Sequence, residues 1–189
     1  MYVKIKRVIH MNHNVVKILR RQQSSRDCFI CGAENTLGFA AQFYEAENGE
    51  LICLAVPKNE YQSYPGRLHG GISSALLDET MGRAILMLHP GIWGVTLEMN
   101  VKFLRPVPLE GMLRITGRID SDRHVFTTSG EILLEDGTVA AEATAKYIKL
   151  PVSKIAAGAD EGELLFMTET EREIDGISRE GALEIVYRP

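Results

Sequence analysis

Apolar and polar residues follow two different periods along the chain, and the longest apolar stretch predicts a buried helix. Between residues 72 and 88 the side chains are mostly small or apolar on every side, which is typical of a helix enclosed by the fold. Gly70 and Gly71 open this stretch, and His89-Pro90-Gly91 is a proline and glycine stop signal. We therefore expect one long central helix.

Strict alternation of apolar and polar residues predicts the strands. Residues 95–103 alternate in this way, and their apolar members are Val95, Leu97, Met99, Val101 and Phe103. This pattern predicts a half-buried strand, and further strand-like segments lie at residues 39–45, 50–56, 113–119, 124–135 and 138–149. Asn48-Gly49 and Asp136-Gly137 are hairpin signals between neighbouring segments. The order of elements indicates an α+β fold with an antiparallel sheet of about five to six strands.

A single carboxylate, Asp78, interrupts the apolar helix without an evident partner. Glu79 beside it precedes Arg83 by four residues, the order that suits an ion pair on a helix surface. Asp78 has no cation three or four positions away, and most of its neighbours there are small: Ser74, Ala75, Met81 and Gly82. A carboxylate in a groove of small side chains is well placed to meet a substrate.

The start of the helix predicts a second part of the site. The first N–H groups of a helix have no intrahelical acceptor and favour negative charge, so Gly70 and Gly71 are candidates for an oxyanion hole. Asp78 lies eight residues beyond Gly70, about 12 Å along one helix, whereas a reacting carbonyl must sit about 3 Å from both groups. If both serve one carbonyl, they must come from two chains, which predicts a two-fold dimer with two shared sites.

The motifs around this helix resemble those of the PaaI-like acyl-CoA thioesterases of the hot-dog superfamily. The resemblance rests on His69-Gly70-Gly71, on the segment LLDETMG at residues 76–82 and on VTLEMNVKFLRP at residues 95–106, and it covers about residues 27–150. It implies a hot-dog fold, in which an antiparallel sheet wraps a long helix, and a dimer or a tetramer made of two dimers. In the relatives, the acidic residue nine positions after the motif histidine is the catalytic nucleophile or base, and that position is Asp78.

The resemblance also assigns roles outside the helix. Relatives often carry Asn or Gln in the preceding loop to hold the attacking water or the thioester, and that position falls on Ser63, with Gln62 beside it. Thr96 matches a substrate-contacting hydroxyl, although alternation places it opposite the apolar side of its strand. His69 is expected to shape the loop rather than act as a base. Met81 and Gly82 are expected near the acyl pocket, and Arg105 and Arg118 are candidates for the CoA phosphates or are solvated charges.

These residues predict hydrolysis of an acyl-CoA thioester, with no cofactor. The alternative is a non-catalytic acyl-CoA-binding or sensing domain, although a pure binder has little need to desolvate a carboxylate. A hydratase or dehydratase is disfavoured because residues 72–88 contain no second histidine. The sequence also lacks a G-x-S-x-G elbow, a P-loop and a dinucleotide fingerprint, which counts against serine hydrolases, nucleotide hydrolases and dehydrogenases.

Composition divides the 189 residues into a hot-dog domain at 27–150 and two extensions. Residues 1–26 contain no Asp or Glu and are basic, and we expect a plain helical extension there, with a targeting peptide or a nucleic-acid arm as alternatives. Residues 151–189 are acidic, with a possible short strand or helix at 164–167, and either pack against the basic leader or are mobile. Met11 is an alternative start.

Charge and cysteine content limit the partners. A net charge of −4 gives no reason to expect nucleic acid, and no apolar run approaches the roughly 20 residues of a membrane span. Three cysteines without a secretory context favour reduced thiols in a cytoplasmic protein. Cys28 and Cys31 have the spacing of a zinc pair, but a structural site needs four ligands and no second pair follows. We therefore interpret the two as small apolar residues leading into the first strand.

Overall fold

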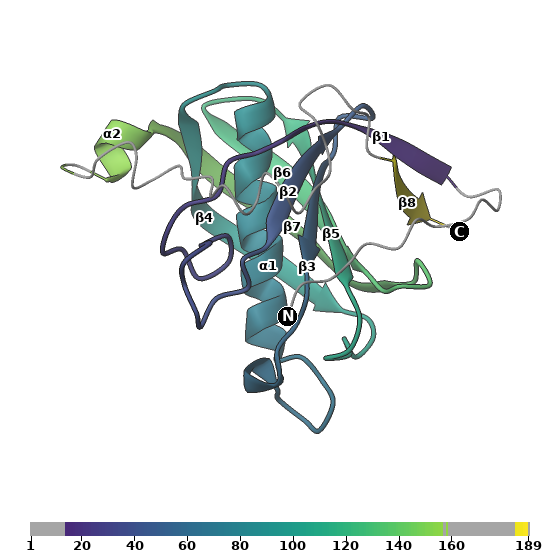
Figure 1. The fold of residues 1–189 in the computed structure, drawn as a ribbon. Helices are drawn as coiled ribbons and strands as arrows, with labels where there is room; N and C mark the ends of the chain where they lie inside the picture. Colours follow the sequence, from purple (N-terminus) through teal and green to yellow (C-terminus); the bar gives the residue numbers. More distant parts are fainter. Residues whose placement is uncertain (1–13, 157, 159–183, 189) are drawn as a thin grey trace.

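A long helix lies at the centre of the structure, and an antiparallel sheet wraps around it (Figure 1). The computed structural model describes residues 14–156, 158 and 184–188, and within them no helix has the length and hydrophobicity that crossing a membrane requires. Helix α1 spans Gly70–Arg83 and continues as the 3₁₀ helix η2 (Ala84–Met87). The remaining elements are β1 (Asn14–Arg21), β2 (Gln42–Ala46), β3 (Leu51–Ala55), η1 (Asn59–Tyr61), β4 (Ile92–Phe103), β5 (Leu113–Ser121), β6 (Val125–Leu133), β7 (Val139–Pro151), α2 (Val152–Ile155) and β8 (Glu184–Arg188).

The strands pair in the order β4-β7-β6-β5-β3-β2-β1-β8. The hairpin β2–β3 turns at Asn48-Gly49 and the hairpin β6–β7 at Asp136-Gly137, where Gly49 and Gly137 have φ of 81° and 82°. Positive φ at these positions is what a tight hairpin turn requires. The predicted α+β fold, the central helix and both hairpins are therefore confirmed.

The N-terminal segment is a strand, and the prediction of a helical extension is wrong for Asn14–Arg21. Val16 and Ile18 are each 5% exposed, whereas Lys17 and Leu19 between and beyond them are exposed. This period of two suits a strand with one buried face, and β1 uses that face to cover a second apolar cluster against β2 and β3. The helical interpretation gave weight to the basic residues and missed this short alternation.

The two ends of the described chain pair with each other. Strand β8 lies antiparallel to β1, so the sheet has eight strands instead of the expected five to six. The acidic C-terminal extension therefore meets the basic leader through backbone pairing. The earlier residues of the leader and the segment 164–167 lie outside the described residues.

Glycines in the sheet let α1 approach it closely. Helix α1 buries Leu76, Leu77 and Met81 completely, and η2 does the same for Ile85. A Cβ atom added to Gly117 of β5 would lie only 2.9 Å from the backbone oxygen of Thr80 on the helix. A larger residue would force helix and sheet apart, so Gly117 sets the distance between the two layers.

Strand β4 forms one edge of the sheet and carries a bulge. Its register with β7 shifts just after Thr96, where Leu97 is the extra residue. Thr96 faces the helix before the bulge, and Met99 and Val101 pack against the core after it. Leu97 and Phe103 are 56% and 57% exposed. The predicted inward side is wrong at Leu97, whereas Phe103 lies on the helix side as predicted, with its ring 3.5 Å from the position of a Cβ atom on Gly70. The bulge explains the error at Leu97, and the unpaired edge explains the exposure of Phe103.

Candidate active site

Asp78 lies where α1 faces strands β4 and β7. Its Oδ1 accepts a hydrogen bond from the Thr96 hydroxyl at 2.9 Å. The Tyr147 hydroxyl lies 3.1 Å from Oδ1 and 3.1 Å from the backbone carbonyl oxygen of Asp78, and it donates to this pair of acceptors. Both donors are neutral, and within the described chain no cation forms an ion pair with Asp78. The carboxylate is half-buried, and its Oδ2 accepts no hydrogen bond from any described residue. The structure thus holds one oxygen of Asp78 by hydroxyl donors and gives the other no hydrogen-bond donor among the described residues.

The bulge in β4 brings Thr96 to Asp78. In a strictly alternating strand, Thr96 would face away from the helix whenever Met99 and Val101 face the core. The extra residue Leu97 shifts the alternation by one, so all three side chains face the same side. Thr96 is also the cross-strand partner of Tyr147 on β7, so the two hydroxyls are neighbours on one face of the sheet.

Tyr147 is the residue of this site that the sequence analysis missed. Its ring stacks on Phe126 with 5.1 Å between centroids, and a Cβ atom added to Gly82 would lie 3.1 Å from its Cε1. Burial and then the neighbouring Asp78 charge raise the pKa of Tyr147, so the phenol keeps its proton and donates to the carboxylate. The only signal in the sequence is a tyrosine that follows alternating alanines on the buried face of β7.

The start of α1 distinguishes the two glycine N–H groups. His69 is the N-cap residue, and its Nδ1 accepts a hydrogen bond from the Gly71 N–H at 2.9 Å. His69 thus caps the helix, and the N–H of Gly71 is already used in this hydrogen bond. Within the described chain the Gly70 N–H donates no hydrogen bond.

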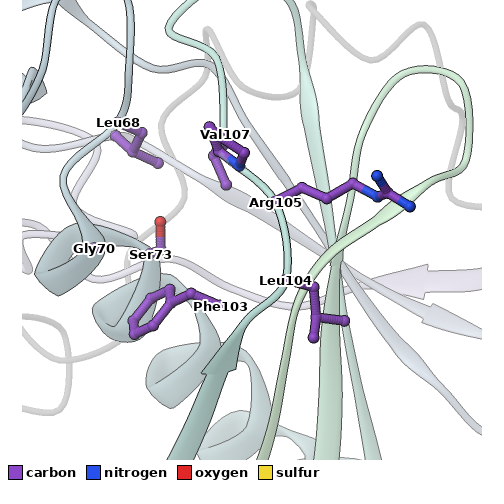
Figure 2. Close-up of a pocket in the computed structure, with 8 residues that line it drawn as sticks. Leu68, Gly70, Ser73, Phe103, Leu104, Arg105 and Val107 are labelled. Atoms are coloured by element: carbon purple, nitrogen blue, oxygen red, sulfur yellow. The ribbon is translucent and has the colours of Figure 1, made fainter.

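A cavity of about 330 Å³ opens beside Gly70. Figure 2 shows the side chains of Leu68, Ser73 and Phe103 beside Gly70, while the side chain of Arg105, which also lines the cavity, extends away from them. The cavity joins the start of α1 to the loop that follows β4, and Arg105 is exposed at its edge. The structure thus brings two predicted residues, Gly70 and Arg105, to one cavity.

The remaining predicted residues lie elsewhere in the fold. Gln62 and Ser63 are exposed in the loop before the helix, where the Gln62 Oε1 accepts the Gly66 N–H at 2.7 Å and so closes that loop. Met81 is fully buried in the core. Arg118 lies on the face of β5 turned away from the helix and forms ion pairs with two carboxylates, Glu50 at 3.3 Å and Glu131 at 3.8 Å.

The pair Glu79–Arg83 forms, but it does not lie on the surface. Arg83 Nη1 is 3.3 Å from the Glu79 carboxylate, and the Arg83 side chain is only 2% exposed. Its guanidinium packs 4.6 Å from the centre of the Phe43 ring. The predicted surface pair is therefore wrong in its position, because the loop of residues 22–31 covers this side of the helix.

Comparison with known proteins gives a family for this arrangement. The family model of the thioesterase superfamily matches residues 65–141. Acyl-coenzyme A thioesterase THEM4 of Bos taurus is 30% identical over 134 residues, which cover 69% of this chain and 54% of that protein. Human acyl-coenzyme A thioesterase 13 is 31% identical over 74 residues, which cover 39% of this chain and 53% of that protein. The chain spans about half the length of these relatives.

Solved structures agree with the family match. A thioesterase superfamily protein is 30% identical with a TM-score of 0.61, and the match covers 65% of this chain and 60% of that chain. A phenylacetic acid degradation-related protein from Ralstonia eutropha is 28% identical with a TM-score of 0.52, over 58% of this chain and 85% of that chain. A Streptococcus pneumoniae thioesterase protein solved with coenzyme A is 25% identical with a TM-score of 0.50, over 55% and 82%. The sequence motifs, the fold and these similarities together show that the chain belongs to the hot-dog thioesterase superfamily.

Proposed function

We propose that this protein hydrolyses an acyl-CoA thioester to the free acid and CoA, as a PaaI-like thioesterase. The observation that carries the proposal is the Asp78 carboxylate, whose Oδ1 is held by two hydroxyls while Oδ2 accepts no hydrogen bond from the described residues. The relatives named acyl-coenzyme A thioesterase and the related protein solved with coenzyme A support the substrate class.

Asp78 acts on the thioester carbon through its open oxygen. Thr96 and Tyr147 restrict rotation of the carboxylate, so Oδ2 keeps one direction and the reaction needs less ordering at the moment of attack. This oxygen either attacks the carbonyl carbon or takes a proton from the water that attacks it. In both routes the carbon–sulfur bond breaks, the CoA thiolate leaves and is protonated, and water supplies the oxygen of the acid.

The Gly70 N–H stabilises the negative charge that develops on the thioester oxygen. It lies at the first position of α1, where the helix dipole also favours an anion. We assign this role to Gly70 rather than to Gly71, since His69 already accepts the hydrogen bond of Gly71. His69 then acts by holding the glycine turn in shape.

The two halves of the site come together across a dimer. Strand β4 is an edge strand whose exposed residues include Leu97 and Phe103, and an unpaired apolar edge is a ready surface for a second chain. An antiparallel pairing of two β4 strands centred between residues 99 and 100 would place Thr96 opposite Phe103 of the partner subunit. A Cβ atom on Gly70 would lie 3.5 Å from the Phe103 ring, so Asp78 of one chain would approach the glycine end of the other.

Arg105 is the better of the two candidates for the CoA phosphates. It is exposed at the cavity beside Gly70, where a substrate would enter. Arg118 is already paired with Glu50 and Glu131 on the opposite face of the sheet. A guanidinium at the cavity edge can bind a phosphate in a bidentate manner.

Release of CoA thiol from acyl-CoA substrates of different chain length and from aryl thioesters tests the proposal. Asp78→Asn keeps the size of the side chain and removes the base or nucleophile, so kcat should fall by about 10²- to 10⁴-fold. The control Glu98→Gln removes a carboxylate that forms an exposed ion pair with Lys146 and should leave kcat near the wild-type value. Absence of turnover by the wild type on every thioester would instead support an acyl-CoA-binding domain.

A further inference from the structure

Three candidate metal ligands meet on the side of α1 covered by the N-terminal loop. The sulfur atoms of Cys28 and Cys31 and a carboxylate oxygen of Glu79 all lie within 4.8 Å of one another. Both thiols are free. The two cysteines come from the loop between β1 and β2, whereas Glu79 lies on the central helix beside Asp78, so the sequence alone did not connect them.

The turn around Cys28 directs backbone donors at its sulfur. The N–H groups of Ile30 and Cys31 donate to Cys28 Sγ at 3.3 and 3.4 Å, and the Gly32 N–H donates to the Cys28 carbonyl at 2.8 Å. A Cβ atom on Gly32 would overlap with that carbonyl oxygen, so the turn requires glycine. N–H groups that converge on one sulfur stabilise a thiolate, the form that binds metal.

The sulfur of Cys31 has its own set of donors. Ser25 N–H and Arg83 Nη1 donate to Cys31 Sγ at 3.5 and 3.4 Å. The Ser25 hydroxyl lies 3.2 Å from the same sulfur, and either atom of that pair can be the donor. Polar groups that surround the ligand atoms are the usual outer layer of a metal site. Donors of this kind suit a sulfur atom that carries negative charge, as a metal-bound thiolate does.

The buried charges balance when a divalent cation is added. As metal ligands, two thiolates and the Glu79 carboxylate would carry three negative charges, and Arg83 supplies one positive charge at 3.3 Å from Glu79. The guanidinium is itself fixed by Gln22 Oε1 at 3.2 Å and by the carbonyl of Gln23. A cation of charge +2 therefore makes the cluster neutral, which a half-buried position demands.

We propose that Cys28, Cys31 and Glu79 bind one zinc ion, with water as the fourth ligand. Two thiolates and a carboxylate are ligands that zinc accepts in tetrahedral geometry. The ion ties the loop of residues 22–32 to α1 at the residue next to Asp78, so it fixes the helix that carries the candidate catalytic carboxylate. The assignment is independent of the reaction at Asp78, because it concerns a different side of the helix.

Metal content of the purified full-length protein tests the assignment. After incubation with zinc and gel filtration, mass spectrometry of the metal should find about one zinc per chain in the wild type and in the control Cys53→Ala, which removes a buried thiol outside the cluster. Cys28→Ser and Glu79→Gln should each weaken zinc binding by more than about tenfold, since even loss of a supporting group weakens a metal site by 10- to 100-fold. Circular dichroism verifies that each variant is folded.

A second measurement uses only the wild type. Cobalt added to protein stripped with a chelator should give thiolate-to-cobalt charge-transfer absorption and the visible bands of a tetrahedral site, and zinc should displace it. Wild-type protein that binds neither metal, or a folded Cys28→Ser variant with wild-type affinity, would overturn the proposal. A native mass lower by two hydrogen atoms, with Cys28 and Cys31 unreactive towards thiol reagents, would overturn it in favour of a disulfide.

Discussion

Replacement of Gly70 by proline removes the proposed oxyanion donor while keeping the helix. Gly70 is the first residue of α1, where proline is favoured because its missing N–H has no intrahelical acceptor. The preceding residue, His69, has φ of −64° and ψ of 135°, which is the conformation that a residue before proline prefers. The helix position and the conformation of His69 are therefore both compatible with proline at residue 70.

The expected loss follows from the chemistry of a single donor. Removal of one oxyanion-hole hydrogen bond lowers kcat by about 10²- to 10³-fold, or about 2.7–4 kcal/mol in the barrier. Gly70→Ala is the matched control, because it keeps the N–H and its Cβ would lie 3.5 Å from the Phe103 ring, an ordinary contact. Steady-state release of CoA thiol measures both variants, and inhibition by free CoA checks that the proline ring leaves the site accessible.

Equal kcat values for Gly70→Pro and Gly70→Ala would refute the assignment of Gly70. A large loss in both variants, with weakened CoA inhibition, would equally refute it, since the effect would then be steric. Thermal unfolding of each variant is measured beside the kinetics, so that a destabilised helix is recognised separately.

The same variant tests whether the site is shared between chains. Gly70→Pro and Asp78→Asn should each be nearly inactive alone. When they are co-expressed, about half of the randomly formed dimers combine one chain of each kind, and such a dimer has one intact site of two, so about a quarter of wild-type activity should return. No recovery, despite mixed dimers seen by native mass spectrometry, would show that each site uses one chain only.

Three further substitutions address the hydroxyl pair, the helix packing and the sheet edge. Tyr147→Phe keeps the stacking on Phe126 and removes the hydrogen bond to the carboxylate. Because hydrogen bonds to charged groups are worth about 1.5–3 kcal/mol, kcat should fall by at least about tenfold. An unchanged kcat in steady-state assays would show that Tyr147 is not part of the site. Gly117→Ala places a Cβ atom 2.9 Å from a helix carbonyl and should lower the free energy of unfolding by about 1–3 kcal/mol in urea titrations, whereas wild-type stability would show that helix and sheet separate easily. Leu97→Asp adds a charge to the exposed edge of β4 and should shift sedimentation towards monomer, and an unaltered dimer would place the interface elsewhere.

The sequence predicted those features that depend on local patterns. The apolar run before and after Asp78 indicated a buried helix with one unusual carboxylate, and two hairpin turns followed from Asn-Gly and Asp-Gly pairs. Gly70 and Gly71 became candidate donors from their place at the helix start, since the unsatisfied N–H groups there are a property of every helix, and their role in the reaction stays a prediction. These predictions needed no knowledge of which strands lie side by side.

Features that depend on tertiary packing could not be predicted in this way. Tyr147 lies near Asp78 because β7 pairs with the edge strand β4, which places Tyr147 beside Thr96. These two residues are 51 positions apart in the chain. The ion pair of Glu79 looked like a surface pair because its spacing fits one, and nothing local showed that a loop with Cys28 and Cys31 would cover it. The alternation of β4 predicted the wrong side for Thr96, because a bulge leaves almost no trace in the sequence.

The extra residue Leu97 lets the inner face of β4 be polar at one end and apolar at the other. If Thr96 faced the helix in an uninterrupted strand, the alternation would carry Glu98, Asn100 and Lys102 inward with it. Two charged side chains and one amide would then enter the apolar interior. The single extra residue changes the phase, so that a hydroxyl serves the carboxylate at one end while methionine and valine line the inside at the other. Deleting Leu97 would therefore reverse which side chains of half the strand face inward. Either Thr96 would turn away from Asp78, or Met99 and Val101 would turn out of the core.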